Sequence, residues 1–390
     1  MKQLVAVCYH SINNNKNAMD KDRKIRVAIT HGDTNGIGYE LIFKTFADSE
    51  MLDICTPIIY GSPKVAAYHR NALDMEANFS IVNSANEATD GRVNMLPVFD
   101  EEIKVELGTP SLEAGHAAVQ SLDKAITDFK DGLIDVLVTC PVNNDTLTVN
   151  GFTLPSQAKY IEDSIGEGRK GLDILINEQL RVALMTDNIA LKDVADAITM
   201  EGIIEKVAIL YATLRRDMRI SNPRIAILAL NPNDREEHPG KEESDAIIPA
   251  VTKLADAGVN AFGPYQASSL FGSGDYFAFD GVLAMYHDQG VAPFKALNPC
   301  NNIHYFGGLP LICTSVDMDP CYDIAGKGVA DESSLRHAIF MAIDCFRNRN
   351  NFDAPMAHPL PKLYHERRDD SEKVRFSIPK KHEGSNKENQ

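Results

Sequence analysis

A histidine, an aspartate and a glutamine follow one another in AMYHDQG, residues 284–290. The apolar run GVLAMY predicts a buried strand, which places His287 and Asp288 at its carboxyl end, where open α/β sheets bind their ligands. An imidazole at such a position could hold a metal ion or act as a base. A metal bound there would need further ligands from other parts of the chain.

Three other polar segments follow predicted strands, and each has two interpretations. The turn in ITHGDTNGIGYE, residues 29–40, could direct backbone N–H groups at an anion, or its glycines could serve a plain β–α turn. TCPVNNDTL, residues 139–147, could line a site or cap a helix. DIAGKGVADESS, residues 323–334, could approach a nucleotide ribose or form a tight surface turn.

The elements that would position these residues alternate along the chain. A helix is predicted over 111–129, with Val119, Leu122, Ile126 and Phe129 on one face, and others are predicted from Ile37 and from Pro63. The predicted strands are IRVAIT, TPIIYG, IDVLVT, LDILI, LRVALM, RIAILAL and GVLAMY. Alternating strands and helices predict an α/β fold with a largely parallel sheet.

Composition excludes several classes of partner. The 390 residues are 44% hydrophobic and carry a formal charge of 39 − 55 = −16 with no basic stripe, which argues against nucleic acid. Seven scattered cysteines without a CxxC pair predict a reducing, cytoplasmic location. No segment is long and apolar enough to predict a membrane span. Residues 1–24 read as a polar extension, and 365–390 as a disordered charged tail.

In their order and spacing these motifs, with LNPND (230–234) and GGLPLICTSVD (307–317), resemble the 4-hydroxythreonine-4-phosphate dehydrogenase family of vitamin B6 synthesis. The resemblance implies an isocitrate/isopropylmalate dehydrogenase-like fold of two interwoven α/β domains. Domain 1, which carries the cofactor loop, would comprise 25–155 plus 301–364. Domain 2, which carries the metal, substrate and dimer contacts, would comprise 156–300.

The resemblance also implies an activity. Members of the family use NAD to oxidise 4-(phosphooxy)-threonine, and the resulting β-keto acid loses CO2. The expected assembly is a homodimer with the active site at the subunit interface and a divalent metal held by three histidines. Such a metal stabilises the negative charge that develops on oxygen in both steps.

At the metal positions the sequence departs from the family. His287 matches the third histidine, whereas Asn188 and Asn233 occupy the first two positions. Amide and carboxylate oxygens suit Mg2+ or Mn2+ better than Zn2+, so the usual metal-dependent activity is expected to be impaired or altered. The neighbouring residues that could replace the lost ligands are Asp187, Asp234, Asp288 and His238.

The substrate positions differ as well. Lys295 matches a family substrate contact, while Gln157 and Ala158 replace a histidine and a threonine. His304 replaces an asparagine, and Cys313 replaces an arginine. Loss of that guanidinium removes the best single-residue holder of a phosphate.

On the cofactor side, Asp323, Gly326 and Gly328 match the family's loop, although residues 318–321 before it are altered. The predicted catalytic residues are His287, as metal ligand or base, Asp288 beside it, and Lys295, which would hold an anion or supply a proton. Two alternatives stay open. One is an inactive paralogue that forms a heterodimer with an intact family member, and the other is a dehydrogenase for a different hydroxy acid.

Overall fold

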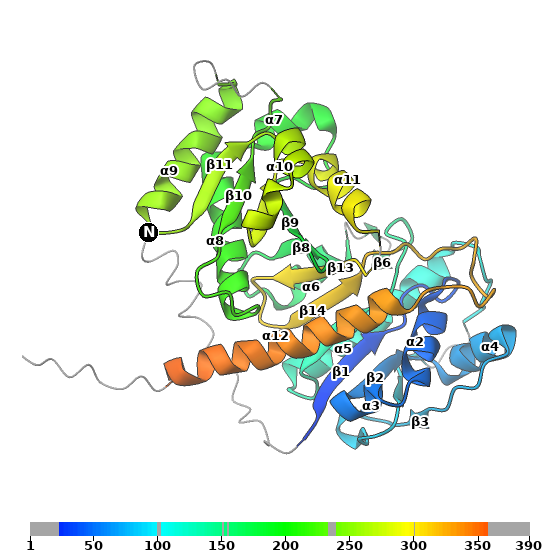
Figure 1. The fold of residues 1–390 in the computed structure, drawn as a ribbon. Coiled ribbons are helices and arrows are strands. Elements are labelled where there is room, and N and C mark those ends of the chain that lie inside the picture. The colour runs from blue at the N-terminus through cyan, green and yellow to red at the C-terminus, as the bar shows by residue number, and fades with distance from the viewer. Residues whose placement is uncertain are drawn as a thin grey trace, which may run out of the picture.

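A long sheet forms the centre of the molecule (Figure 1). The computed structural model describes residues 23–99, 103–149, 152–153, 156–232, 239–299 and 301–357. The strands of this sheet are β1 (Ile25–Thr30), β2 (Cys55–Gly61), β3 (Ser80–Ile81), β4 (Asn94–Pro97), β5 (Val136–Thr139), β8 (Leu172–Ile176), β9 (Arg181–Leu184), β10 (Ile225–Leu228), β11 (Ala261–Tyr265), β12 (Gly281–Ala284), β13 (Ile303–Gly307) and β14 (Ile312–Val316). A separate hairpin pairs β6 (Thr148–Val149) with β7 (Phe152–Thr153).

The sheet runs in the order β11-β10-β12-β9-β8-β13-β14-β5-β1-β2-β4-β3. Most neighbours are parallel, and the antiparallel pairings β9/β8, β8/β13 and β13/β14 are adjacent to one another near its middle. The predicted α/β class with a largely parallel sheet is therefore confirmed. All seven predicted strands are present, since they correspond to β1, β2, β5, β8, β9, β10 and β12.

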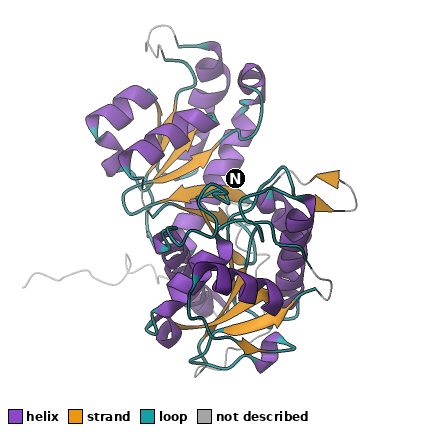
Figure 2. Ribbon diagram, turned by 90° about the vertical axis from the view of Figure 1, so that its right-hand side faces the viewer, coloured by secondary structure: helices purple, strands orange, loops and turns teal. Residues whose placement is uncertain are grey.

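Helices cover both faces of the sheet (Figure 2). They are α2 (Gly38–Ala47), α3 (Met51–Ile54), α4 (Pro63–Leu73), α5 (Leu112–Lys130), α6 (Gln157–Ile165), α7 (Val194–Ala197), α8 (Met200–Arg216), α9 (Ile248–Asp256), α10 (Ala267–Ser273), α11 (His287–Leu297) and α12 (Ser333–Ala357). Within the described ranges, no helix combines the length and the apolar character that crossing a bilayer requires.

Helix α5 illustrates how the sequence pattern produces the packing. Ser111 caps it by accepting a hydrogen bond from the Ala114 amide at 3.1 Å, so the helix begins where the apolar periodicity begins. Val119, Leu122 and Ile126 are buried, as their helical spacing predicts. Phe129, on the same face, is partly buried.

The molecule has two lobes joined at mid-sheet (Figure 1). β1 to β5 lie in one lobe and β8 to β12 in the other, while the β13–β14 hairpin pairs with β8 on one side and β5 on the other. The hairpin thus belongs to the sheet of both lobes. The exact division into 25–155 plus 301–364 and 156–300 stays a prediction, and the proposed tail and most of the proposed N-terminal extension lie outside the described residues.

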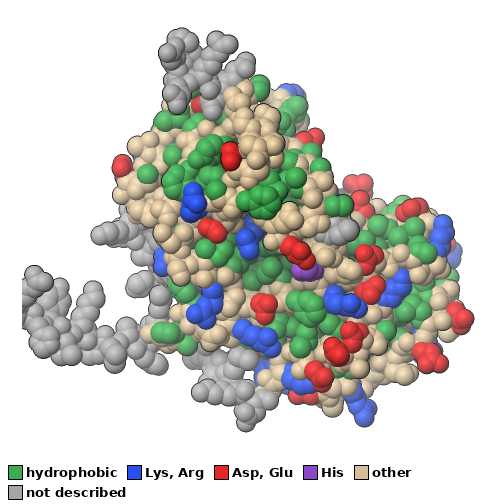
Figure 3. Space-filling model, viewed as in Figure 1, with side chains coloured by type: hydrophobic (Ala, Val, Ile, Leu, Met, Phe, Trp, Pro, Cys, Tyr) green, Lys and Arg blue, Asp and Glu red, His purple; other side chains and the backbone are tan. Residues whose placement is uncertain are grey.

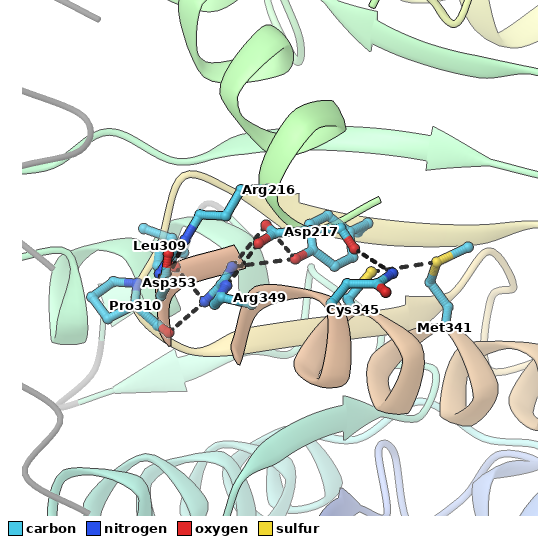
Figure 4. A network of polar contacts seen from close by, with 10 residues as sticks. Arg216, Asp217, Leu309, Pro310, Met341, Cys345, Arg349 and Asp353 are labelled. Atoms are coloured by element: carbon cyan, nitrogen blue, oxygen red, sulfur yellow. Dashed lines mark hydrogen bonds and ion pairs between the residues drawn. The ribbon is translucent and has the colours of Figure 1, made fainter. Parts of the chain in front are cut away.

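A buried polar network ties helix α12 to the second lobe (Figure 4). Arg349 donates from Nε and Nη2 to the two carboxylate oxygens of Asp217, at 2.7 and 2.8 Å. The Tyr305 hydroxyl donates to the same carboxylate at 2.8 Å, and Arg216 forms an ion pair with Asp353. Because Asp217 ends α8 and Tyr305 lies on β13, the network fixes three elements together.

Candidate active site

The loops with the predicted metal positions lie at one edge of the sheet. β10, β12 and β9 are consecutive parallel neighbours, so their carboxyl ends point the same way. Asn188 follows β9 and His287 follows β12. Asn233, Asp234 and His238 follow β10 but lie outside the described residues.

His287 is the first residue of helix α11 and its side chain is 54% exposed. Its Nδ1 lies 2.8 Å from Oδ1 of Asp288, and an ionised carboxylate only accepts, so Nδ1 carries the proton. The Nε2 lone pair then remains as the ligand or base. A carboxylate on the far ring nitrogen is the usual means of orienting a metal-binding or basic histidine.

Gln289 fixes the turn that presents His287. Its Oε1 accepts from the Met285 amide at 2.7 Å, and its Nε2 donates to the Ala229 carbonyl at 2.6 Å. One side chain therefore joins the ends of β12 and β10. A cavity of about 440 Å3 opens beside this turn. Its lining residues include Asn231, Tyr286, Asp288 and Gln289.

Asn188 occupies a left-handed turn, with φ of 52°. Its amide Nδ2 donates to Asp187 Oδ2 at 3.2 Å, and both side chains are exposed. Asparagine, aspartate and histidine are the side chains that best tolerate this backbone region. The described residues contain no cluster of three or more His, Cys, Asp or Glu side chains able to hold a metal ion.

Lys295 and His304, two predicted substrate contacts, are linked through Asp317. Lys295 Nζ lies 2.8 Å and His304 Nε2 3.3 Å from the same oxygen, Asp317 Oδ1. His304 Nδ1 lies 2.9 Å from Asp173 Oδ2 on the neighbouring strand β8. In the space-filling view, a histidine with acidic and basic side chains near it is visible where the two lobes meet (Figure 3).

The sequence interpretation missed Asp173 and Asp317. Each carried a signal, since Asp173 interrupts the apolar strand LDILI and Asp317 ends the apolar strand ICTSV. Burial opposes protonation of His304, but the two carboxylates outweigh it and raise the pKa of the imidazole to about 10. Burial also works against ionised Asp317, yet hydrogen bonds and charge from His304 and Lys295 lower its pKa below the usual value.

The other predicted substrate positions lie on α6 and on β14. Gln157 and Ala158 form the first turn of α6, where Ser156 caps the helix. Ala158 packs against an apolar cluster that contains Cys313, whose side chain is fully buried in β14. Burial raises the pKa of the Cys313 thiol well above its ordinary value. Substrate contact by these three residues stays a prediction.

The predicted cofactor loop rests against the β1–α2 turn. Tyr322 donates to Asp33 Oδ2 at 2.7 Å, and Glu40 Oε1 accepts from the Ala330 amide at 2.8 Å. Asp323 and Gly328 are exposed between these anchors, and Gly326 and Gly328 have φ of 76° and 73°, which glycine adopts without strain.

The β1–α2 turn packs directly against two other loops of the chain, which contain Pro141 and Pro320. The Asp33 amide donates to the Pro141 carbonyl at 2.8 Å, and the Ile37 amide donates to the Pro320 carbonyl at 3.1 Å. A side chain at Gly32 or Gly36 would collide with these carbonyls, at 2.2 and 2.7 Å. The glycines here allow close packing of three loops, which favours the plain-turn interpretation over the anion-binding one.

Comparison with known proteins gives a consistent result. The family model described as "Pyridoxal phosphate biosynthetic protein PdxA" matches residues 53–342. A 4-hydroxythreonine-4-phosphate dehydrogenase from Bacteroides thetaiotaomicron is 50% identical over 91% of this chain and 98% of its own. One from Sulfurihydrogenibium is 34% identical over 82% of this chain and 98% of its own.

Solved structures agree with the sequence relatives. The 4-hydroxythreonine-4-phosphate dehydrogenase of Burkholderia phymatum aligns with a TM-score of 0.69 at 31% identity, over 83% of this chain and 99% of that one. The enzyme of the same name from Klebsiella pneumoniae gives 0.70 at 27% identity with the same coverage. The chain belongs to the PdxA family of pyridoxal phosphate biosynthetic proteins.

Proposed function

We propose that this protein is an NAD-dependent dehydrogenase that oxidises the hydroxyl group of 4-(phosphooxy)-threonine and releases CO2 from the product. The observation that carries the proposal is the 50% identity across nearly the whole of a relative that bears this activity in its name. The geometry supports it, because His287 and Lys295 project from one helix, α11, whose first turn follows β12 at the ligand-binding edge of the sheet.

Each proposed catalytic side chain has a role that follows from its surroundings. The Lys295 ammonium is half exposed and can hold the anionic group of the substrate. His287, oriented by Asp288, offers Nε2 to the substrate hydroxyl. Lys295 lies eight positions after His287, which is a rise of about 12 Å along the helix axis. We propose that the two side chains contact different groups of the same substrate.

These groups account for the hydride, the protons and the CO2 of the proposed reaction. Asp323, Gly326 and Gly328 would hold NAD, which when bound accepts the hydride from the substrate carbon. His287 Nε2 takes the hydroxyl proton as the carbonyl forms and later releases it to solvent. The β-keto acid then loses CO2, and the electrons of the broken bond form an enolate. Lys295 donates a proton to the enolate carbon that lost CO2 and regains one from solvent.

The described residues do not fit a three-histidine zinc centre, because His287 is the one histidine they supply at the three predicted metal positions and Asn188 offers an amide oxygen at another. No step above depends on a metal. Where a divalent ion assists, we propose Mg2+ or Mn2+, with Asn233 and Asp234 as further oxygen donors.

We further propose a cytoplasmic homodimer. The described cysteines are free thiols, as a reducing compartment favours. Ile189 and Leu191, 44% and 72% exposed, directly follow Asn188 in the loop after β9. Exposed apolar side chains beside a ligand-binding edge favour a subunit contact there. A heterodimer with an intact family member is the alternative assembly.

NADH formation by the purified protein tests the proposed function. The assay supplies NAD with 4-(phosphooxy)-threonine and, in parallel, with 4-hydroxythreonine, which lacks the phosphate. We expect turnover of the phosphorylated compound and little of the other. Turnover of other hydroxy acids only would assign a different substrate, and a folded protein inactive with every hydroxy acid would point to the non-catalytic paralogue.

A further inference from the structure

Four ionisable side chains form an alternating chain of charges between the lobes. Asp173 of β8 contacts Nδ1 of His304 on β13, at 2.9 and 3.0 Å from its two oxygens. His304 Nε2 then faces Asp317 Oδ1, which also receives Lys295 Nζ. The order of charge is negative, positive, negative, positive, and it ends on the half-exposed ammonium of Lys295.

The two cations of this chain are not equivalent. Both ring nitrogens of His304 face carboxylates, so a protonated His304 has no N–H group left for a ligand. Its side chain is also only 25% exposed. Lys295 has three N–H groups, of which Asp317 requires one, and the side chain is 50% exposed. A ligand anion can therefore bind Lys295 but not His304.

Asp317 is the residue that couples the two cations. Its side chain is only 9% exposed, and its Oδ2 is buried with no hydrogen-bond partner among the described residues. A buried carboxylate in this state depends on neighbouring cations for its charge compensation. When Lys295 turns one N–H group toward a ligand, the cation that continues to compensate Asp317 is His304.

We propose that His304 and Asp173 are positioning residues, which act through Asp317 to keep the Lys295 ammonium available for the phosphate or carboxylate of the substrate. This inference rests on the proposed function for the identity of the ligand. It differs from the sequence interpretation, which made His304 a direct substrate contact. It also assigns roles to Asp173 and Asp317, which that interpretation did not include.

The electrostatics of the cluster favour a permanently cationic His304. The charged groups that surround it are Asp173 on β8, Asp317 after β14 and Lys295 on α11. Two further titratable groups, Lys206 on α8 and the buried Cys313 thiol, interact electrostatically with Asp173. Burial opposes protonation, but the carboxylates of Asp173 and Asp317 hold the pKa of His304 at about 10. Removing the Asp173 charge lowers that pKa toward neutrality, so the imidazolium then titrates within an accessible pH range.

Binding to purified variants tests the proposal. The variants are His304→Gln, Asp173→Asn, Lys295→Met and the double variant His304→Gln/Lys295→Met, and His116→Gln on the exposed face of α5 is the matched control. Calorimetric titrations measure the Kd of 4-(phosphooxy)-threonine and of inorganic phosphate from pH 6 to 9. Thermal unfolding confirms that each variant is folded.

We expect His304→Gln to weaken phosphate-group binding about tenfold in the wild-type background and not at all in the Lys295→Met background. We expect Asp173→Asn to bind normally at pH 6 and progressively more weakly toward pH 9. His116→Gln should match the wild type. Equal weakening by His304→Gln in both backgrounds would overturn the proposal, because it would mean that His304 contacts the anion itself or only supports the fold.

An NMR titration separates this inference from the proposed function. In protein with labelled histidines, the His304 ring signal should stay that of an imidazolium up to pH 9, and Asp173→Asn should shift its midpoint to lower pH. If the wild type neither binds nor oxidises 4-(phosphooxy)-threonine while this titration behaves as expected, the substrate assignment fails and the cluster stands. A His304 signal that titrates near pH 6.5 in the wild type would overturn the inference itself.

Discussion

At the scale of single residues, the candidate site depends on how His287 is held. Asp288 takes the proton-bearing side of the imidazole, and Gln289 fixes the turn from which the ring projects. Both contacts come from the two residues that directly follow His287, so the short sequence HDQ largely determines how the imidazole is oriented. Metal binding at Nε2, which stays a prediction, would depend on the ligands that the loops after β9 and β10 supply.

Restoring histidines at the two asparagine positions should raise zinc affinity. Asn188 has a backbone that histidine also tolerates, so the Asn188→His/Asn233→His variant should fold with a free energy of unfolding within about 0.5 kcal/mol of the wild type. It should bind Zn2+ at least about tenfold more tightly, because imidazole is a far better zinc ligand than an amide oxygen. Competition with a chromophoric chelator measures this, and unchanged zinc affinity would show that these loops do not face a common ion.

His31 makes the fold sensitive to acid. The ring is fully buried and stacks on Tyr39 with centroids 5.4 Å apart, and burial lowers its pKa to about 4. Its folded pKa lies below the unfolded value of 6.5, so its contribution is complete above pH 6.5 and is lost as pH falls toward 4. Between pH 7.5 and 5 this loss is about 2 kcal/mol. Urea unfolding of His31→Phe should show a smaller loss over the same range, and an identical loss would contradict this assignment.

At the scale of elements, strand ends bring distant loops together. The strands and the motifs that follow them could be predicted from the sequence. Apolar runs with β-branched residues identified seven strands, and the motif after each strand indicated a site at the carboxyl edge. The prediction missed the short strands β3, β4, β6 and β7 as well as β11, β13 and β14. In β11 and β13 the reason is visible, because AFGPY and IHYFG mix glycine, proline and polar residues into the apolar pattern. The pairing of β13 with β8 sets the contact between His304 and Asp173, and such long-range pairing leaves no local signal.

Arg349 on helix α12 should contribute strongly to the free energy of unfolding. Arg349→Met would leave Asp217 buried without its bidentate cation, which costs about 3–5 kcal/mol. Arg347→Met is the matched control on the same helix, because Arg347 is 55% exposed and lies 3.9 Å from Asp344. That change should cost less than about 1 kcal/mol. Equal effects of the two substitutions on urea unfolding would show that the buried network contributes little.

At the scale of the whole molecule, the β13–β14 hairpin and α12 connect two lobes that each have their own parallel strands. The candidate site draws on the second lobe and on the hairpin, since Lys295 lies on α11, His304 lies on β13 and Asp317 directly follows β14. The family resemblance implied two domains, whose exact bounds stay a prediction, and the sharing of the hairpin between the lobes is visible only in the sheet order.

Leu191→Asp should disrupt the proposed homodimer. Burying an aspartate in an apolar subunit contact is costly, so light scattering after gel filtration should show the mass fall from about twice 42.9 kDa to 42.9 kDa. Leu112→Asp, at a 63% exposed leucine in the other lobe, should leave the mass unchanged. A dimer that persists in Leu191→Asp would place the subunit contact elsewhere.

The rate of NADH formation from 4-(phosphooxy)-threonine, measured separately with Mg2+, Mn2+ and Zn2+, is the decisive test of the proposed dehydrogenase activity. We predict turnover by the unmodified protein, faster with Mg2+ or Mn2+ than with Zn2+, and one CO2 released per NADH. The Asn188→His/Asn233→His variant should shift the preference toward Zn2+. No NADH with any of the three ions, from protein shown to be folded and dimeric, would contradict the proposed dehydrogenase activity.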